Sequence, residues 1–141
     1  MNTMAMKQYD FYTDGACNQD KIGGWSFYCP RLKLRVCGKR EDTTNNAMEL
    51  LAIDKVLKYI ARAMSDDIKI NIHSDSAWAI GALTKEWNLT SHKEKVEEMK
   101  RTIAVLKEQR NIEVVFTKVA GHSGIEENEV CDQLAVIMSN N

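Results

Sequence analysis

The sequence predicts one α/β domain, residues 1–141, in which helices flank a mixed five-stranded sheet. Three strand-like segments come first, and strand-like segments then alternate with segments of helical periodicity. Strands that are close in sequence pair as antiparallel hairpins, whereas strands separated by a helix pair in parallel through a right-handed crossover. A single mixed sheet satisfies both kinds of connection, and a chain of 141 residues can bury a core without disulfides or metal ions.

The first three strands are expected at residues 9–13, 25–29 and 32–37, where only Pro30 and Arg31 separate the second and third as in a tight antiparallel hairpin. Residues 46–64 have the apolar spacing of a long helix. Residues 68–75 alternate isoleucines with polar residues, as a strand does. The later elements are expected to be a short helix, a longer helix, a strand and a final helix at residues 76–83, 93–109, 112–119 and 126–138.

Composition excludes several classes of protein. The net charge of −1 gives neither the overall basic field of many nucleic-acid binders nor the acidic tail of a histone-binding chaperone. The four cysteines form no CxxC pair, which argues against a zinc site. No apolar run is long enough for a membrane span, and the first residues lack the apolar core of a signal peptide. We therefore expect a cytoplasmic protein with reduced thiols and no membrane partner.

Two aspartates are expected where strands end. Asp14 follows the first strand, in the stretch "FYTDGAC", and Asp75 follows the fourth. Sites in sheets of this kind form beyond the carboxyl ends of the strands, so the two carboxylates can lie close together. The alternative for each is an ordinary turn or helix-capping aspartate.

Glu49 is the third candidate, because it lies on the apolar side of the long helix. A carboxylate there is costly unless it is paired or bound to a cation. The alternative is a capping box in which Glu49 folds back onto the helix start at Asn46. A helical wheel aligns Glu49 with Ala52, Ile53, Val56, Ile60 and Ala63, and puts the polar face, Asp54, Lys55, Lys58 and Arg62, on the opposite side.

Two further candidates lie near the end of the chain. Asp132 flanks the apolar stripe of the final helix, where a solvated aspartate is equally compatible with the pattern. His122 lies in the loop "AGHSG", which suits either an idle exposed histidine or a mobile proton carrier. Four carboxylates without Cys or His ligands favour Mg²⁺ or Mn²⁺, and a clustered set can hold two ions about 4 Å apart for attack on a phosphodiester.

Four motifs give the sequence a family resemblance. The stretches "YTDGAC", "TTNNAMELLA", "IHSDSAW" and "VAGHSGIEENEVCDQLA" occur in the order typical of type 1 ribonuclease H, and the resemblance runs from about Tyr9 to Ala135. It implies the ribonuclease H-like fold with strand order 3-2-1-4-5. It also implies an endonuclease that cuts the RNA strand of RNA–DNA hybrids with two Mg²⁺ ions, for which Mn²⁺ can substitute, leaving 5′-phosphate and 3′-hydroxyl ends.

The resemblance also implies roles for individual residues. His122 matches the family's loop histidine, which assists product release or proton transfer. Where many relatives have a Gln and an Arg near the third and fourth acids, this chain has Ala77 and Val130. The residues matching the four metal-binding acids are Asp14, Glu49, Asp75 and Asp132, and those matching substrate contacts are Cys17, Asn18, Thr44, Asn45, Asn46 and Ser76.

Substrate binding is expected to depend on few charges. Many relatives carry a basic protruding helix, but here residues 84–101 are too short for an extra helix and hold five basic and four acidic residues. Trp87 in this stretch is expected to pack on the DNA backbone. We expect a monomer whose partner is an RNA–DNA hybrid. Two other hypotheses remain open, a related 3′–5′ exonuclease or transposase-like nuclease and a catalytically inactive hybrid- or RNA-binding module.

Overall fold

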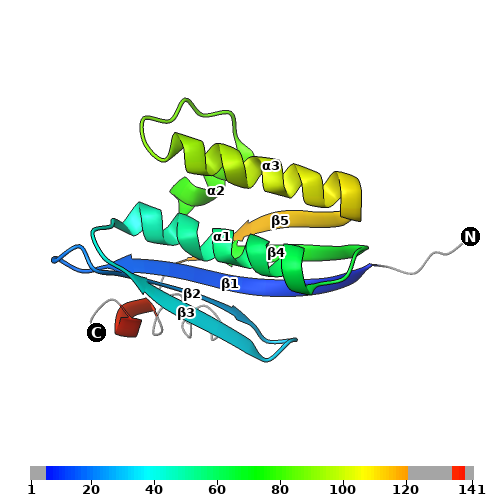
Figure 1. The fold of residues 1–141 in the computed structure, drawn as a ribbon, viewed down its shortest axis with the longest axis horizontal. Helices are drawn as coiled ribbons and strands as arrows, with labels where there is room; N and C mark the ends of the chain where they lie inside the picture. The colour runs from blue at the N-terminus through cyan, green and yellow to red at the C-terminus, as the bar shows by residue number, and fades with distance from the viewer. Residues whose placement is uncertain (1–5, 121–134, 139–141) are drawn as a thin grey trace, which may run out of the picture.

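The computed structural model describes residues 6–120 and 135–138 and contains a single five-stranded sheet (Figure 1). The strand order is β3-β2-β1-β4-β5, with β1–β2 and β2–β3 antiparallel and β1–β4 and β4–β5 parallel. This confirms the predicted mixed sheet and its order. The elements are β1 (Lys7–Cys17), β2 (Gly23–Cys29), β3 (Leu34–Arg40), α1 (Asn45–Ala63), β4 (Ile68–Ser74), α2 (Ala77–Thr84), α3 (Lys93–Arg110) and β5 (Ile112–Lys118).

The core lies between the sheet and helix α1, which crosses one face of the sheet, while α3 lies beside α1 on the same side (Figure 1). In β4 the isoleucines are buried and the residues between them are partly exposed, as the alternation predicts. Three aromatic rings, Phe11, Phe27 and Tyr59, meet beneath α1 with centroids about 6 Å apart. Burying each large side chain contributes about 2 kcal/mol, so this layer is the main source of stability.

Two strands differ from the prediction. Strand β1 does not end at Asp14 but continues to Cys17, because its pairing with β2 runs on to Cys17↔Gly23 after its pairing with β4 has ended at Tyr12↔His73. Strand β3 begins at Leu34, and the two-residue hairpin is wrong. Residues 30–33 form the turn instead, closed by a hydrogen bond from the Lys33 amide to the Pro30 carbonyl with Lys33 at φ 51°.

The helix starts also differ. Thr44 caps α1, since its hydroxyl accepts a hydrogen bond from the Ala47 amide at 3.1 Å, which rules out the alternative of a capping box with Asn46 as the cap. Ser76 is not the first residue of α2 but its cap, and accepts from the Ala79 amide. Within the predicted final helix, the described residues 135–138 are helical. Ala63, placed on the apolar stripe, is exposed because it is the last residue of α1.

The largest correction concerns Asp54, which was placed on the solvated face of α1 but is 2% exposed. Its Oδ2 atom forms ion pairs with Lys58 at 2.9 Å and with Lys95 of α3 at 2.7 Å. Helix α3 covers this side of α1, and the helical wheel contains no information about that neighbour. The carboxylate is therefore buried with two cations as partners.

Candidate active site

Gly15 is where strand β1 and helix α1 come closest. A Cβ atom at this position would overlap the backbone of Met48 and Glu49, so only glycine allows this approach. The Gly15 amide donates to Glu49 Oε1 at 2.7 Å and to Asp14 Oδ1 at 2.9 Å. One backbone N–H thus holds two carboxylates from different elements in fixed positions.

Three of the predicted acids are brought together. Carboxylate oxygens of Asp14, Glu49 and Asp75 all lie within 4.8 Å of one another. Asp14 is 5% exposed, and the other two are partly buried. Among residues 6–120 and 135–138, none of the three pairs with a lysine or arginine. The cluster therefore concentrates acidic groups that no cation within the described part of the chain balances.

The end of the β1–β4 pairing explains why the aspartates meet. The last parallel pair is Tyr12↔His73, and each aspartate follows two residues later on its own chain segment, so both project from the same face just beyond the paired region. The turn after β4 is held by Ser74, whose hydroxyl accepts from the Ser76 amide at 3.1 Å and whose carbonyl accepts from the Val119 amide at 2.9 Å. Asp75 is thereby fixed between two hydrogen-bonded residues.

The electrostatics of Glu49 follow from this arrangement. Burial, then the charge of Asp75 and hydrogen bonding with it, raises the pKa of Glu49 from 4.5 to about 9, although the Gly15 amide acts in the opposite direction. Without a cation the Glu49 carboxyl therefore holds a proton at neutral pH. A divalent cation among the three carboxylates would displace that proton, because it favours the charged form.

The donor chemistry of the cluster fits such a cation. Three carboxylates at this spacing offer hard oxygen ligands of the kind that Mg²⁺ and Mn²⁺ prefer. Asp132, the fourth predicted acid, and His122 lie outside the described residues, so their placement remains a prediction. Sequence reasoning missed Gly15 as a site residue, although the Asp-Gly pair inside a strand is a signal of close backbone approach.

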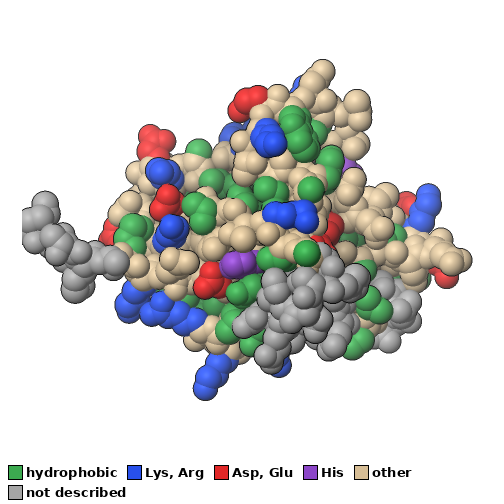
Figure 2. Space-filling view, turned by 180° about the vertical axis from the view of Figure 1, so that it is seen from behind, with side chains coloured by type: hydrophobic (Ala, Val, Ile, Leu, Met, Phe, Trp, Pro, Cys, Tyr) green, Lys and Arg blue, Asp and Glu red, His purple; other side chains and the backbone are tan. Residues whose placement is uncertain are grey.

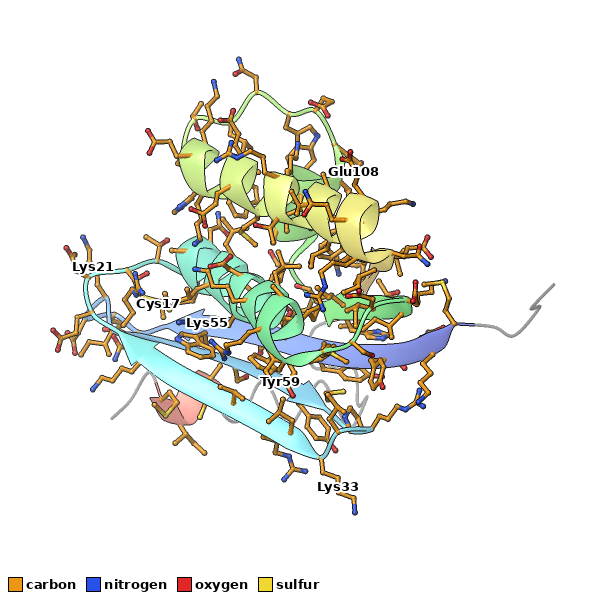
Figure 3. The ribbon with its side chains drawn as sticks, turned by 45° about the vertical axis from the view of Figure 1, so that its right-hand side comes forward. Cys17, Lys21, Lys33, Lys55, Tyr59 and Glu108 are labelled. Carbon is orange, nitrogen blue, oxygen red and sulfur yellow. The ribbon has the colours of Figure 1, made fainter. Side chains whose placement is uncertain are left out.

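Four of the predicted substrate contacts lie where the end of β1 meets the start of α1. Thr44, Asn45 and Asn46 are exposed at the start of α1, and Asn45 lies one turn before Glu49 on the same side of the helix. The Cys17 thiol lies 3.4 Å from the Thr43 carbonyl, which ties the end of β1 to the segment before α1 (Figure 3). These residues therefore lie at the junction of β1 and α1, one turn of helix from Glu49.

The remaining predicted contacts have structural partners. Asn18 Oδ1 accepts from the amides of Asp20 and Ile22, so that oxygen closes the β1–β2 turn. The Ser76 hydroxyl caps α2. Trp87 is 45% exposed on the α2–α3 connection and packs against Gly81. It lines a cleft of about 420 Å³ together with Trp78 and residues 88–91, apart from the carboxylates.

The fold and the site together define a class: an α/β domain whose central strands present a carboxylate cluster suited to divalent metals. The sequence profile of the RNase H family matches residues 6–139, and the chain belongs to that family. It is therefore a ribonuclease H. Enzymes of this family use divalent metal ions and act on the RNA strand of RNA–DNA hybrids.

Individual relatives agree with this assignment. A ribonuclease H of Syntrophomonas wolfei is 38% identical over 142 residues, covering 92% of this chain and 94% of the relative. One from Thermoanaerobacter sp. is 36% identical over 137 residues, covering 89% and 86%. Among solved structures, LC11-RNase H1 isolated from compost superposes with a TM-score of 0.75 at 18% identity, covering 96% of this chain and 97% of that one. This last similarity concerns the fold alone.

Proposed function

We propose that this protein hydrolyses the RNA strand of RNA–DNA hybrids at internal positions, with Asp14, Glu49, Asp75 and Asp132 as ligands of two Mg²⁺ ions. The observation that carries the proposal is the meeting of three carboxylates, from β1, α1 and the end of β4, without a protein cation among the described residues. Bound Mg²⁺ would supply an activated water and neutralise charge on the leaving oxygen.

The chain's own residues position the ions and the substrate. The Gly15 amide orients Glu49 Oε1 and Asp14 Oδ1 before any ligand arrives, so little reorganisation is needed on binding. Glu49 would release its proton when a cation binds, because the cation favours the charged form against the burial and the Asp75 charge that raise the pKa. His122, in its glycine-flanked loop, is proposed to move a proton during the reaction or product release.

The protein is proposed to recognise the hybrid by the shape of its minor groove. A-like duplexes expose 2′-hydroxyls and base edges in a wide, shallow minor groove, which suits small polar side chains. Asn45 and Asn46 are exposed at the start of α1, and Asn45 lies one turn before Glu49. Cys17, Asn18, Thr44 and Ser76 would contact the backbone next to them, and Trp87 would pack on the DNA strand further away.

Two wider properties are also proposals. The protein is proposed to act as a monomer in the cytoplasm, a compartment that suits the free thiols of Cys17, Cys29 and Cys37. Among the described residues, no helix has both the length and the apolar character needed to cross a membrane.

The proposal is tested by a gel assay on RNA–DNA, RNA–RNA and DNA–DNA duplexes with blocked ends, with and without Mg²⁺. We expect internal cuts in the RNA strand of the hybrid only, and only with the metal, ending in 5′-phosphate and 3′-hydroxyl. A 3′–5′ exonuclease cannot act on blocked ends, and an inactive binding module cannot cut, so both alternatives leave every duplex intact. That result would overturn the proposal.

A further inference from the structure

The net charge of −1 hides an uneven distribution. Residues 21–40, which cover the end of the β1–β2 turn, β2 and β3, contain six basic residues and no acidic one. On the side of the molecule opposite α1, lysine and arginine side chains gather near the end of the sheet that carries the β2–β3 turn (Figure 2). Positive charge of this kind attracts a polyanion even when the whole chain is nearly neutral.

The same basic segment borders a cleft on the α1 side. The cleft has a volume of about 370 Å³ and lies between α1, the end of β3 and the start of α3. Its lining contains four basic side chains, two acidic ones and a histidine: Arg40, Lys55, Lys58, Lys95, Asp42, Asp54 and His92. A neighbouring cleft of about 240 Å³ shares Lys55 and Lys58 and adds Arg62. We call Arg40, Lys55, Lys58, Arg62 and Lys95 the α1 basic face.

Two of these cations are held in place by a buried carboxylate. Asp54 Oδ2 pairs with Lys58 and Lys95, and Lys95 also pairs with Glu98 at 3.2 Å. Burial alone would lower the pKa of Lys95, but its interactions with Asp54 and Glu98 outweigh that and raise it, so the ammonium stays charged. Lysines that are already ordered lose less side-chain entropy on binding an anion.

The other three cations have no such partner. Among residues 6–120 and 135–138, Arg40, Lys55 and Arg62 form no ion pair with a carboxylate. Lys55 extends over the ring of Trp25, 5.2 Å from its centroid, on the side of α1 that faces β2 and β3, where Tyr59 also lies (Figure 3). Their charge is thus free to bind an anion from solution.

The α1 basic face continues from the residues proposed to touch substrate. Arg40 ends β3 four residues before Thr44, the cap of α1. From Asn45 to Arg62 the helix rises about 25 Å, which matches about seven base pairs of duplex. Lys55, Lys58 and Arg62 lie on the side of α1 opposite Glu49, so a phosphate backbone that crosses the start of the helix near Thr44 would meet them in succession.

We propose that the α1 basic face binds the sugar-phosphate backbone of the nucleic-acid substrate beyond the cleavage site. This rests on the proposed function for the identity of the substrate. Binding a polyanion needs positive charge, and residues 84–101, with five basic and four acidic residues, supply little of it. The face contacts phosphates only, so it would strengthen binding to hybrid, double-stranded RNA and double-stranded DNA alike.

The test uses the double variant Lys55→Gln with Arg62→Gln, because neither residue neutralises Asp54. Binding to a hybrid longer than about seven base pairs, the duplex length that α1 spans, is measured by fluorescence anisotropy in EDTA over a series of salt concentrations. Arg101→Gln with Lys107→Gln is the matched control, since both residues are exposed and lie on α3 away from α1. Circular dichroism and thermal melting verify that each variant is folded.

We expect the slope of log affinity against log salt to become shallower by about 1.8 in the Lys55/Arg62 variant, about 0.9 for each phosphate that the protein no longer neutralises, and to stay unchanged in the control. The KM for hybrid cleavage should rise in the same variant. An unchanged slope in a folded variant would overturn this proposal, and so would equal losses in variant and control. Because binding is measured without metal, a wild-type protein that binds but does not cut would refute the proposed function only.

Discussion

Helix α1 carries two carboxylates, Glu49 and Asp54, that differ in their partners. Glu49 faces two other carboxylates, and burial and then the charge of Asp75 raise its pKa to about 9, although the Gly15 amide donates a hydrogen bond to it. Asp54 is more deeply buried, yet two ammonium groups lie within 2.9 Å of its Oδ2 atom. One turn and a half of the same helix thus separates a carboxylate that lacks a cation from one that has two.

The comparison teaches how to distinguish a functional buried acid from a structural one. A buried carboxylate whose charge the protein itself balances stabilises packing, here between α1 and α3. A carboxylate left unbalanced in a cluster lowers the stability of the metal-free protein and is retained where a bound cation restores the balance. Substitutions at each acid and at its neighbours should therefore separate the two behaviours.

The largest expected effect is on catalysis. Asp14→Asn or Asp75→Asn removes one charge of the unbalanced cluster, and we expect hybrid cleavage to be lost in Mg²⁺. The free energy of unfolding without metal should stay equal or increase, because repulsion among the carboxylates is reduced. Turnover and urea denaturation measured on the same preparations check both parts. Turnover like that of the wild type in either variant would refute the assignment of the cluster.

Gly15→Ala tests the approach of β1 to α1. The added methyl group would overlap the backbone of Met48 and Glu49, so strand and helix must separate. We expect a loss of about 1–3 kcal/mol in the free energy of unfolding and a severe loss of activity, because the shared amide no longer holds both carboxylates. The same substitution at Gly24 of β2, which pairs with Ala16 of β1, is the comparison variant for stability and activity. Normal activity in Gly15→Ala would show that this contact does not position the site.

Opposite signs are expected for the two acids of α1. Glu49→Gln should raise the free energy of unfolding of the metal-free protein at neutral pH. The reason is that a neutral amide replaces a carboxyl group whose pKa is raised on folding by burial and by Asp75. Asp54→Asn should lower it by roughly 1–3 kcal/mol, since Lys58 and Lys95 lose their common partner; the exposure of both lysines keeps the value modest. Chemical denaturation in EDTA measures both. Equal signs would refute the distinction.

The sequence predicted that Asp14, Glu49 and Asp75 lie together, but not what surrounds them. The alternation of Ile68, Ile70 and Ile72 and the order of strands and helices were enough for the sheet, because local periodicity reports which face is buried. The burial of Asp54 was not predictable in this way, since its partner Lys95 is on another helix. The extension of β1 past Asp14 likewise depends on pairing with β2, which no single segment reveals.

A smaller effect is expected from Mg²⁺ on the stability of the folded protein. Binding to the folded state alone should stabilise it by about 2.7 kcal/mol when the ion is present at 100 times its dissociation constant. We expect the melting temperature of the wild type to rise with Mg²⁺ and that of Asp14→Asn to rise less. Asp54→Asn is the control, because its carboxylate is outside the cluster, and its rise should equal that of the wild type. A similar rise in Asp14→Asn and the wild type would mean that the ion binds elsewhere.

The most direct test of the central claim is a carboxyl NMR titration of Glu49, with and without Mg²⁺. Since the folded pKa lies above the ordinary value of 4.5, the folded protein holds one more proton than the unfolded chain between pH 4.5 and about 9, and its stability falls as pH rises through that window. We predict a Glu49 pKa far above 4.5 in EDTA, near 9, and a large decrease on adding Mg²⁺. A Glu49 that titrates near 4.5 in both conditions would contradict the account.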